Sequence, residues 1–241
     1  MSEPRDRPRS GTATRHETVF LFDVDNTLLD NDAVVRDLRA FLTATVGRTR
    51  QAHYFALFEQ IRAEVGYADY LEALQRFRLE YPREPHLLAV STYLVNYPFA
   101  DRLYPGALAA IAHVRRWGPA VVLSDGDVVF QPRKVERSGI LDAVHGQVLI
   151  YVHKECMLDD VAHRYPARHY VMIDDKLRLL TAIKRTWAAR VTTVFVRQGH
   201  YALDPAQTAS YPAADVSLER IGDLLTLHPP DLAAAGPRLA R

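Results

Sequence analysis

Four polar clusters directly follow apolar runs of the sequence, at residues 23–27, 124–127, 153–155 and 174–176. The first cluster reads Asp-Val-Asp-Asn-Thr, so Asp23 and Asp25 are two residues apart and face the same side of an extended backbone. Two carboxylates this close repel each other unless a proton or a cation lies between them. Oxygen ligands of this kind suit Mg²⁺. The spacing therefore indicates a site for acid–base or metal-assisted chemistry.

Taken singly, each cluster has a plainer interpretation: Ser124 can begin a turn, Lys154 can be solvated, and Asp174 can cap a following helix. The position they share argues against this. Each cluster follows a run that is typical of a buried strand, at residues 18–22, 120–123, 148–152 and 170–173, with a further run at 192–196. Helical spacing in residues 177–189, between two of these runs, predicts βαβ units. We therefore expect an α/β fold, a Rossmann-like three-layer structure with a parallel sheet and helices on both faces.

The carboxyl ends of parallel strands lie at one edge of an open sheet, where ligands bind. The four clusters would meet at that edge. There they would supply a nucleophile, an acid or base, a hydrogen-bond donor, a neutralising lysine and a metal cage. This combination is typical of phosphoryl transfer.

Residues 32–97 follow a different pattern. Their apolar residues keep helical spacing, as in Phe55, Phe58, Ile61 and Val65, and the segment contains no convincing strand. We expect a helical cap at 32–97, inserted into an α/β core that comprises residues 18–31 and 98–227. Residues 1–17 and 228–241 are expected to be tails, the first of them disordered.

The charges of the chain nearly cancel, because 30 Lys and Arg stand against 29 Asp and Glu, a formal net charge of +1. Nucleic-acid-binding proteins normally carry a strong basic excess, so we expect no nucleic-acid partner. No apolar run approaches the ~18 residues that span a bilayer, so we expect no membrane segment. Cys156 is the only cysteine, which excludes an intramolecular disulfide and suits the reducing cytoplasm. The sequence makes no prediction of the oligomeric state.

Together the four clusters resemble the motifs of the haloacid dehalogenase-like (HAD) superfamily. Residues 22–28, Phe-Asp-Val-Asp-Asn-Thr-Leu, are similar to its first motif, Asp-x-Asp-x-Thr after an apolar strand. Ser124 matches the second motif, Lys154 the third, and Asp174-Asp175 the acidic fourth, in the order of the family. The resemblance covers residues 18–196 and carries no signature for the helical insertion.

The resemblance implies a role for each carboxylate. Asp23 would attack phosphorus and form an aspartyl-phosphate, which splits hydrolysis into two easier steps. Asp25 would protonate the leaving oxygen and then take a proton from water. Asp23, the backbone carbonyl of Asp25, and Asp174 or Asp175 would hold Mg²⁺. Asp175 occupies the position of the direct ligand, and Asp174 would act through water.

The resemblance also implies how the phosphoryl group is held. Ser124 would donate a hydrogen bond to it, Gly126 would offer its backbone amide, and Lys154 would offset its charge while keeping Asp23 ionised. In dehalogenases of the superfamily the second acidic position is not an aspartate, and in its transport ATPases it is a threonine. Asp25 therefore favours a phosphatase or phosphotransferase.

Several neighbouring residues receive plainer interpretations. Lys134 competes with Lys154 for the third motif, but it falls in a predicted helix, where lysines are usually solvated, so we favour Lys154. Asp125 and Asp127 are expected to shape a turn, and His153 to lie beside the site or at the surface. Residues 198–201 are expected to form a loop at the site rim, and Cys156 to be a small core residue.

Helical insertions after the first motif act as caps in this superfamily, and a cap excludes water and bulky partners. We therefore expect a cytoplasmic, Mg²⁺-dependent phosphatase that acts on a small phosphorylated metabolite. Two alternatives stay open. One is a phosphotransferase or phosphomutase of the same superfamily, and the other is a non-catalytic regulatory protein that retains the phosphate site.

Overall fold

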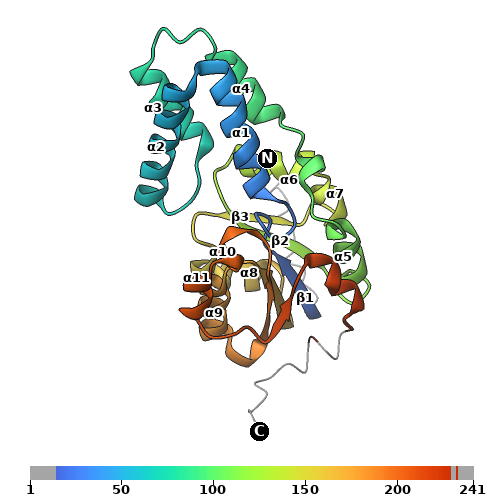
Figure 1. Cartoon of the computed structure of the whole chain (residues 1–241). Coiled ribbons are helices and arrows are strands. Elements are labelled where there is room, and N and C mark those ends of the chain that lie inside the picture. The colour runs from blue at the N-terminus through green and yellow to red at the C-terminus, as the bar shows by residue number, and fades with distance from the viewer. Residues whose placement is uncertain (1–14, 229–231, 233–241) are drawn as a thin grey trace, which may run out of the picture.

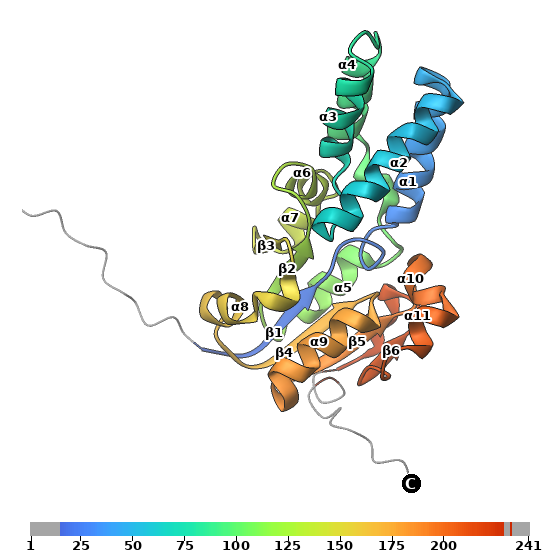
Figure 2. The ribbon, with the colours of Figure 1, turned by 90° about the vertical axis from the view of Figure 1, so that its left-hand side faces the viewer.

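The computed structural model describes residues 15–228 and residue 232. In this part of the chain six strands form one parallel sheet (Figure 1), in the order β3-β2-β1-β4-β5-β6, and Figure 2 labels all six. The strands are β1 (His16–Phe22), β2 (Ala120–Asp125), β3 (Val148–Tyr151), β4 (Ala167–Asp174), β5 (Val191–Val196) and β6 (Val216–Leu218). Most contain runs of Val, Ile, Thr and Phe, which favour a strand buried on both faces. The order reverses between β1 and β4, which is the point where open α/β sheets bind ligands.

Alternate residues of each strand pack into two separate hydrophobic clusters. Phe20 and Phe22 of β1 point to one face, where they pack with the helices α5 (Ala107–Val114), α6 (Phe130–Arg137), α7 (Ile140–Ala143) and the 3₁₀ helix η4 (Ile221–Thr226). Val19 and Leu21 point to the other face, toward α8 (Leu158–Arg164) and α9 (Leu177–Trp187). The expected three-layer α/β fold is thus confirmed.

Between β1 and β2 the chain forms a helical module that projects beyond the carboxyl edge of the sheet (Figure 2). It contains α1 (Asn31–Val46), α2 (Arg48–Val65), α3 (Tyr70–Glu80) and α4 (Leu87–Asn96), and the 3₁₀ helix η1 (Phe99–Arg102) follows. Asp30 caps α1, because its carboxylate accepts a hydrogen bond from the backbone N–H of Ala33 at 2.7 Å. The buried Tyr54 joins α2 to α3 by donating its hydroxyl proton to the carbonyl of Tyr70 at 2.8 Å.

The remaining elements are short: η2 (Lys154–Cys156), η3 (Ala188–Arg190), α10 (Gly199–Leu203) and α11 (Pro205–Ala209). Helix α10 corrects the expectation of a loop at residues 198–201. Strand β1 begins at His16, so residues 16 and 17 belong to the sheet rather than to a tail. Strand β6 was not predicted. Leu232, in the expected C-terminal tail, packs into the hydrophobic core; residues 1–14, 229–231 and 233–241 of the two expected tails lie outside the described residues.

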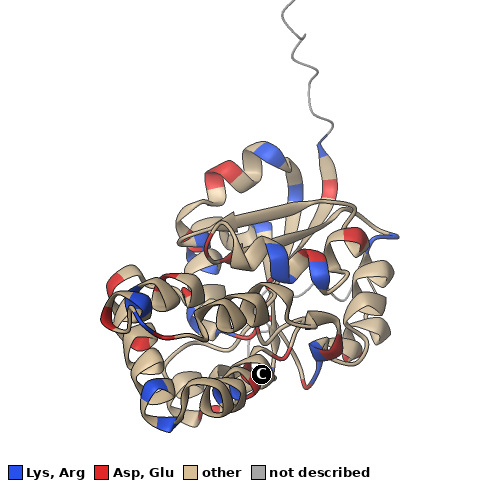
Figure 3. Ribbon diagram, turned by 90° about the horizontal axis from the view of Figure 1, so that it is seen from above, with Lys and Arg blue, Asp and Glu red and all other residues tan. Residues whose placement is uncertain are grey.

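Charged residues of both signs are interspersed along the ribbon, as the small net charge leads one to expect (Figure 3). Among the described helices, none combines the length and the apolar character that crossing a membrane requires.

Candidate active site

The four polar clusters meet at the carboxyl edge of the sheet. Parallel register aligns Phe22 with Val122 on one side and with Ile173 on the other, so the residues that follow these three positions lie side by side. Asp23 therefore adjoins Asp174, the last residue of β4. The sequence interpretation of these clusters as one site agrees with this arrangement.

Lys154 lies at the centre of the edge and is completely buried. Its Nζ lies 2.6 Å from Asp23 Oδ1 and 2.7 Å from Asp174 Oδ2, and it donates to the carbonyl of Leu123 at 3.2 Å. Burial disfavours the ammonium charge, but the carboxylates of Asp174 and Asp23 outweigh this effect and raise the pKa of Lys154 above its usual value. Lys154 therefore remains charged and neutralises part of the acidic site.

Asp23, Asp174 and Asp175 are buried, and one carboxylate oxygen of each lies within 4.8 Å of the other two. Asp174 is already engaged: Oδ1 accepts the backbone N–H of Lys176 at 2.8 Å, and Oδ2 contacts Lys154. By contrast, both oxygens of Asp175 are buried without a hydrogen-bond donor among the described residues. Burial raises the pKa of Asp175 well above its usual range; the ammonium of Lys176 opposes this shift, and the charges of Asp174 and Asp23 add to it.

Such a cluster fits a hard divalent cation. A buried carboxylate without a donor is stable only if it is protonated or if a positive charge adjoins it. Carboxylate oxygens are the ligands that Mg²⁺ prefers. The donor set and the lack of partners at Asp175 therefore suit that ion.

Asp25 is bound by Lys134, whose side chain was expected to be solvated. The side chain of Lys134 is only 1% exposed, and its Nζ lies 2.6 Å from Asp25 Oδ1 and 3.1 Å from Asn31 Oδ1. Asp25 itself keeps 23% exposure, toward the cavity. The expectation for Lys134 was wrong because α6 turns this residue inward: Phe130, Lys134 and Val135 are all buried on the same side of the helix. The spacing of these three residues in the sequence was the signal from which the burial of Lys134 could have been predicted.

Ser124 is buried at the end of β2, and its hydroxyl oxygen accepts a hydrogen bond from Gln131 Nε2 at 2.9 Å. Asp125 and Asp127 shape the following turn, as expected. Asp125 accepts the backbone N–H of Lys154 at 2.7 Å, and Asp127 accepts those of Val129 and Phe130 at the start of α6. Burial raises the pKa of Asp125 to about 6.

Gly126 does not offer the phosphate contact predicted for its amide. Its backbone N–H donates to the carbonyl of Tyr151 at 3.0 Å, which occupies the donor. Glycine is needed at this position for a steric reason. A Cβ atom here would lie 2.6 Å from the Cβ of Gln131, which is too close.

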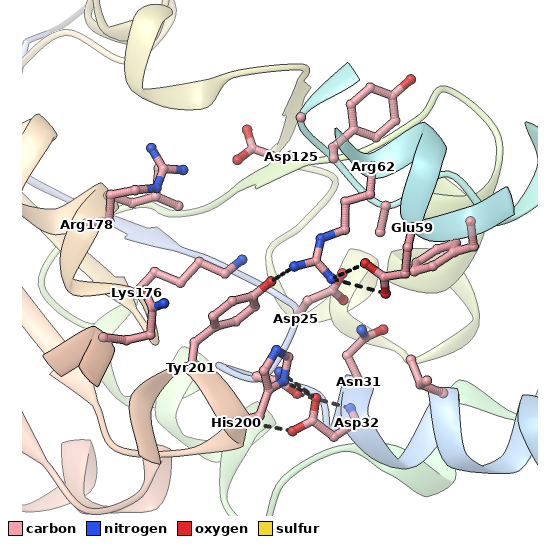
Figure 4. A pocket seen from close by; sticks show the side chains of 18 of the residues that line it. Asp25, Asn31, Asp32, Glu59, Arg62, Asp125, Lys176, Arg178, His200 and Tyr201 are labelled. Atoms are coloured by element: carbon pink, nitrogen blue, oxygen red, sulfur yellow. Dashed lines mark hydrogen bonds and ion pairs between the residues drawn. The ribbon is translucent and has the colours of Figure 1, made fainter. Parts of the chain in front are cut away.

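A cavity of about 460 Å³ opens above Asp25 and is lined by both the core and the helical module. Figure 4 shows Arg62 of α2 and Tyr201 of α10 meeting across it, and Arg62 Nη2 donates to the Tyr201 hydroxyl at 2.7 Å. Below them, Asp32 accepts the backbone N–H and the Nδ1 of His200 at 2.8 and 2.6 Å (with Nδ1 assigned as the protonated nitrogen). His200 and Tyr201 thus line the cavity, whereas residues 198–201 were expected at its rim.

Two further expectations concern the loop after β3. His153 is exposed and lies against the end of α2, where a Cβ atom on Gly66 would be 2.5 Å from its ring. This agrees with a position beside the site. Cys156 is exposed rather than part of the core: it ends the 3₁₀ turn η2, whose first residue, Lys154, is the buried one.

The fold and the site together define a class of α/β enzyme whose polar residues gather at the carboxyl edge of a parallel sheet, beneath a helical insertion. Residues 18–186 match the family model of the haloacid dehalogenase-like hydrolases. The chain therefore belongs to that family of hydrolases.

Solved structures agree with this assignment. A structure described as a haloacid dehalogenase-like hydrolase from Burkholderia xenovorans is 62% identical, covers 88% of this chain and 99% of its own, and gives a TM-score of 0.85. An L-2-haloacid dehalogenase from Xanthobacter autotrophicus is 19% identical, covering 88% and 98%, with a TM-score of 0.58. A magnesium-bound HAD-hydrolase from Bacillus subtilis is 16% identical, covering 89% and 100%, with a TM-score of 0.56. The last two show similarity of fold. No curated protein matched significantly.

Proposed function

We propose that this hydrolase is a Mg²⁺-dependent phosphatase that cleaves a small phosphorylated metabolite through an aspartyl-phosphate intermediate. The observation that carries the proposal is the carboxylate of Asp175, which is buried without a hydrogen-bond donor beside Asp23 and Asp174. An unpaired buried carboxylate costs several kcal/mol, and a divalent cation would offset that cost. Asp23 and Asp175 would bind the ion directly, with the backbone carbonyl of Asp25. Asp174, whose oxygens are engaged, would act through water.

Asp23 is the nucleophile in this mechanism. Lys154 holds Asp23 Oδ1, and Thr27 donates its hydroxyl proton to Oδ2 at 3.2 Å, so the carboxylate is fixed in orientation. In this orientation the carboxylate would attack phosphorus. When bound, Mg²⁺ would polarise the phosphoryl group and offset its charge. Ser124 donates its hydroxyl proton to the carbonyl of Asp125 at 3.3 Å; it would turn that donor to a phosphoryl oxygen while its own oxygen still accepts from Gln131.

Asp25 supplies the proton for the leaving group. Lys134 binds Asp25 Oδ1, which leaves Oδ2 to carry a proton to the departing ester oxygen and later to accept one from water. An alkoxide is a poor leaving group and needs that proton, whereas a halide leaves as a stable anion and does not. A carboxyl group held here therefore supports phosphoester cleavage over dehalogenation.

The size of the cavity supports a small substrate. About 460 Å³ lies within the range of pockets that enclose single metabolites, and helices of the insertion form one wall. A folded phosphoprotein would not reach Asp23 beneath them.

Release of inorganic phosphate from aryl, sugar and carboxylic-acid phosphates, with Mg²⁺ and with EDTA, tests the proposal. We expect Mg²⁺-dependent turnover by the wild type. A parallel assay with 2-chloropropionate measures chloride release. Chloride without phosphate would overturn the phosphatase proposal in favour of dehalogenation. Phosphorylated acceptor alcohols in place of free phosphate would instead indicate a phosphotransferase.

A further inference from the structure

The carboxylates that border the cavity already have partners. Asp32 accepts two hydrogen bonds from His200, Asp125 accepts the backbone N–H of Lys154, and Asp25 pairs with Lys134. Asp25 is thus ion-paired, and Asp32 and Asp125 have acceptor oxygens that are already hydrogen-bonded.

Lys176 is different, because its ammonium borders the cavity without a hydrogen bond or ion pair to any described residue. Its one close side-chain contact is with the ring of Tyr201, 5.0 Å from Nζ to the ring centroid. Its backbone N–H donates to Asp174, which fixes the residue beside the acidic cluster. Burial disfavours the charge, but the carboxylates of Asp175, Asp23 and Asp174 attract this ammonium and raise the pKa of Lys176 above its usual value, so the side chain carries a positive charge at the border of the cavity.

Arg62 approaches the same point from the helical module. Its Nη2 donates to the Tyr201 hydroxyl, while Nη1 lies 3.3 Å from Glu59 on the same helix. A guanidinium has five donors, so these two contacts leave others available. Figure 4 shows the ends of Lys176 and Arg62 pointing toward the Tyr201 hydroxyl from opposite walls.

Without a metal ion, Lys176 offsets part of the negative charge of Asp23, Asp174 and Asp175. With Mg²⁺ bound, the charge of Asp23, Asp174 and Asp175 is balanced by the ion together with Lys154. Lys176 and Arg62 then remain as donors to whatever part of the substrate extends from Asp23 toward the insertion.

We propose that Lys176, Arg62 and Tyr201 form a second anion subsite, so that the substrate is a phosphomonoester with a further anionic group, a carboxylate or a second phosphate. This inference rests on the proposed phosphatase function and adds its substrate class. Planar guanidinium and ammonium donors together suit either oxyanion. Because Arg62 belongs to α2, the second anion would also join the insertion to the core.

Matched substrates test the subsite. For a carboxylate, 3-phosphoglycerate is compared with glycerol 3-phosphate; for a second phosphate, glucose 1,6-bisphosphate is compared with glucose 6-phosphate. We expect the wild type to favour the more anionic member of at least one pair by about tenfold or more in kcat/KM, from the strength of charged hydrogen bonds. Lys176→Met and Arg62→Met should remove that preference, because they lower kcat/KM for the more anionic member of the pair more than for the less anionic one. Arg185→Met, a change at an exposed residue of the helix α9 that Lys176 directly precedes, should leave both unchanged.

Calorimetric titration of the same compounds into the Mg²⁺-loaded protein separates the two proposals. Preferential binding of the more anionic compound, lost in Lys176→Met, without phosphate release would retain the subsite and overturn the phosphatase. Equal kcat/KM and equal affinity within both pairs would overturn the subsite, whether or not phosphate is released. If Lys176→Met and Arg62→Met lowered kcat/KM equally for both members of a pair, the subsite would also be overturned. Such a result would indicate a general structural effect.

Discussion

Lys134 Nζ lies 2.6 Å from Asp25 Oδ1, although 109 residues separate the two in sequence. Asp25 comes from the loop after β1, and Lys134 from α6, after β2. The pair is nearly closed to solvent on the lysine side and open to the cavity on the carboxylate side. Lys134 therefore fixes one oxygen of the proposed acid and leaves the other facing the substrate.

Lys134→Met tests this relationship. We expect kcat to fall by about a hundredfold with a smaller change in KM, because a misplaced general acid loses most of its contribution. The loss should be smallest for aryl phosphates, whose leaving groups need little protonation. The measurement is kcat against the pKa of the leaving group.

The matched control for this variant is Lys184→Met. Lys184 also pairs with a carboxylate, at 2.7 Å from Asp215, but its pair lies away from the cavity. Its loss should lower stability and leave kcat within about twofold. Equal sensitivity of aryl and alkyl phosphates in Lys134→Met would contradict the role of Asp25 as the acid.

Asp23→Asn should remove turnover by about a thousandfold or more, because the amide cannot attack phosphorus. The change keeps the shape of the side chain, so circular dichroism should show a folded protein. Acid-quenched wild-type enzyme should carry phosphate in an alkali-labile linkage, and the variant should carry none. A variant with wild-type phosphate release would exclude Asp23 as the nucleophile.

His169 gives the protein a pH-dependent stability. Burial lowers the pKa of its imidazole, with help from Lys184 and against the effect of Asp215. As pH falls below the usual value of 6.5, the unfolded chain takes up the proton before the folded one, so stability declines toward the lowered pKa of the folded state. We expect His169→Gln to reduce the loss of unfolding free energy between pH 7.5 and pH 5. Urea denaturation at pH 7.5 and pH 5 measures this loss. If the wild type and His169→Gln lost the same unfolding free energy, His169 would not be the group responsible.

The strand ends of the site could be predicted because each polar cluster follows an apolar run. Asp23, Ser124, Lys154 and Asp174 take their positions from parallel pairing, which a local pattern reveals. The helical insertion was predictable for the same reason, from the spacing of its apolar residues.

The missed features depend on contacts between distant parts of the chain. Arg62 and Tyr201 meet across 139 residues, and no local pattern encodes that distance. Helix α10 spans only Gly199–Leu203, too short for an apolar period to show. Lys134 differs in part: its spacing with Phe130 and Val135 marks the buried side of α6, but its partner Asp25 lies 109 residues away in the sequence.

Asp175→Asn separates the metal site from the fold. Without metal we expect this variant to melt at a higher temperature than the wild type, because it removes a buried carboxylate whose raised pKa reflects the cost of its charge. Mg²⁺ should raise the melting temperature of the wild type and leave that of the variant nearly unchanged. Asp159→Asn, an exposed acid on α8, serves as the control and should respond like the wild type. Thermal denaturation with EDTA and with Mg²⁺ measures both effects, and an equal Mg²⁺ response in Asp175→Asn would remove Asp175 from the metal site.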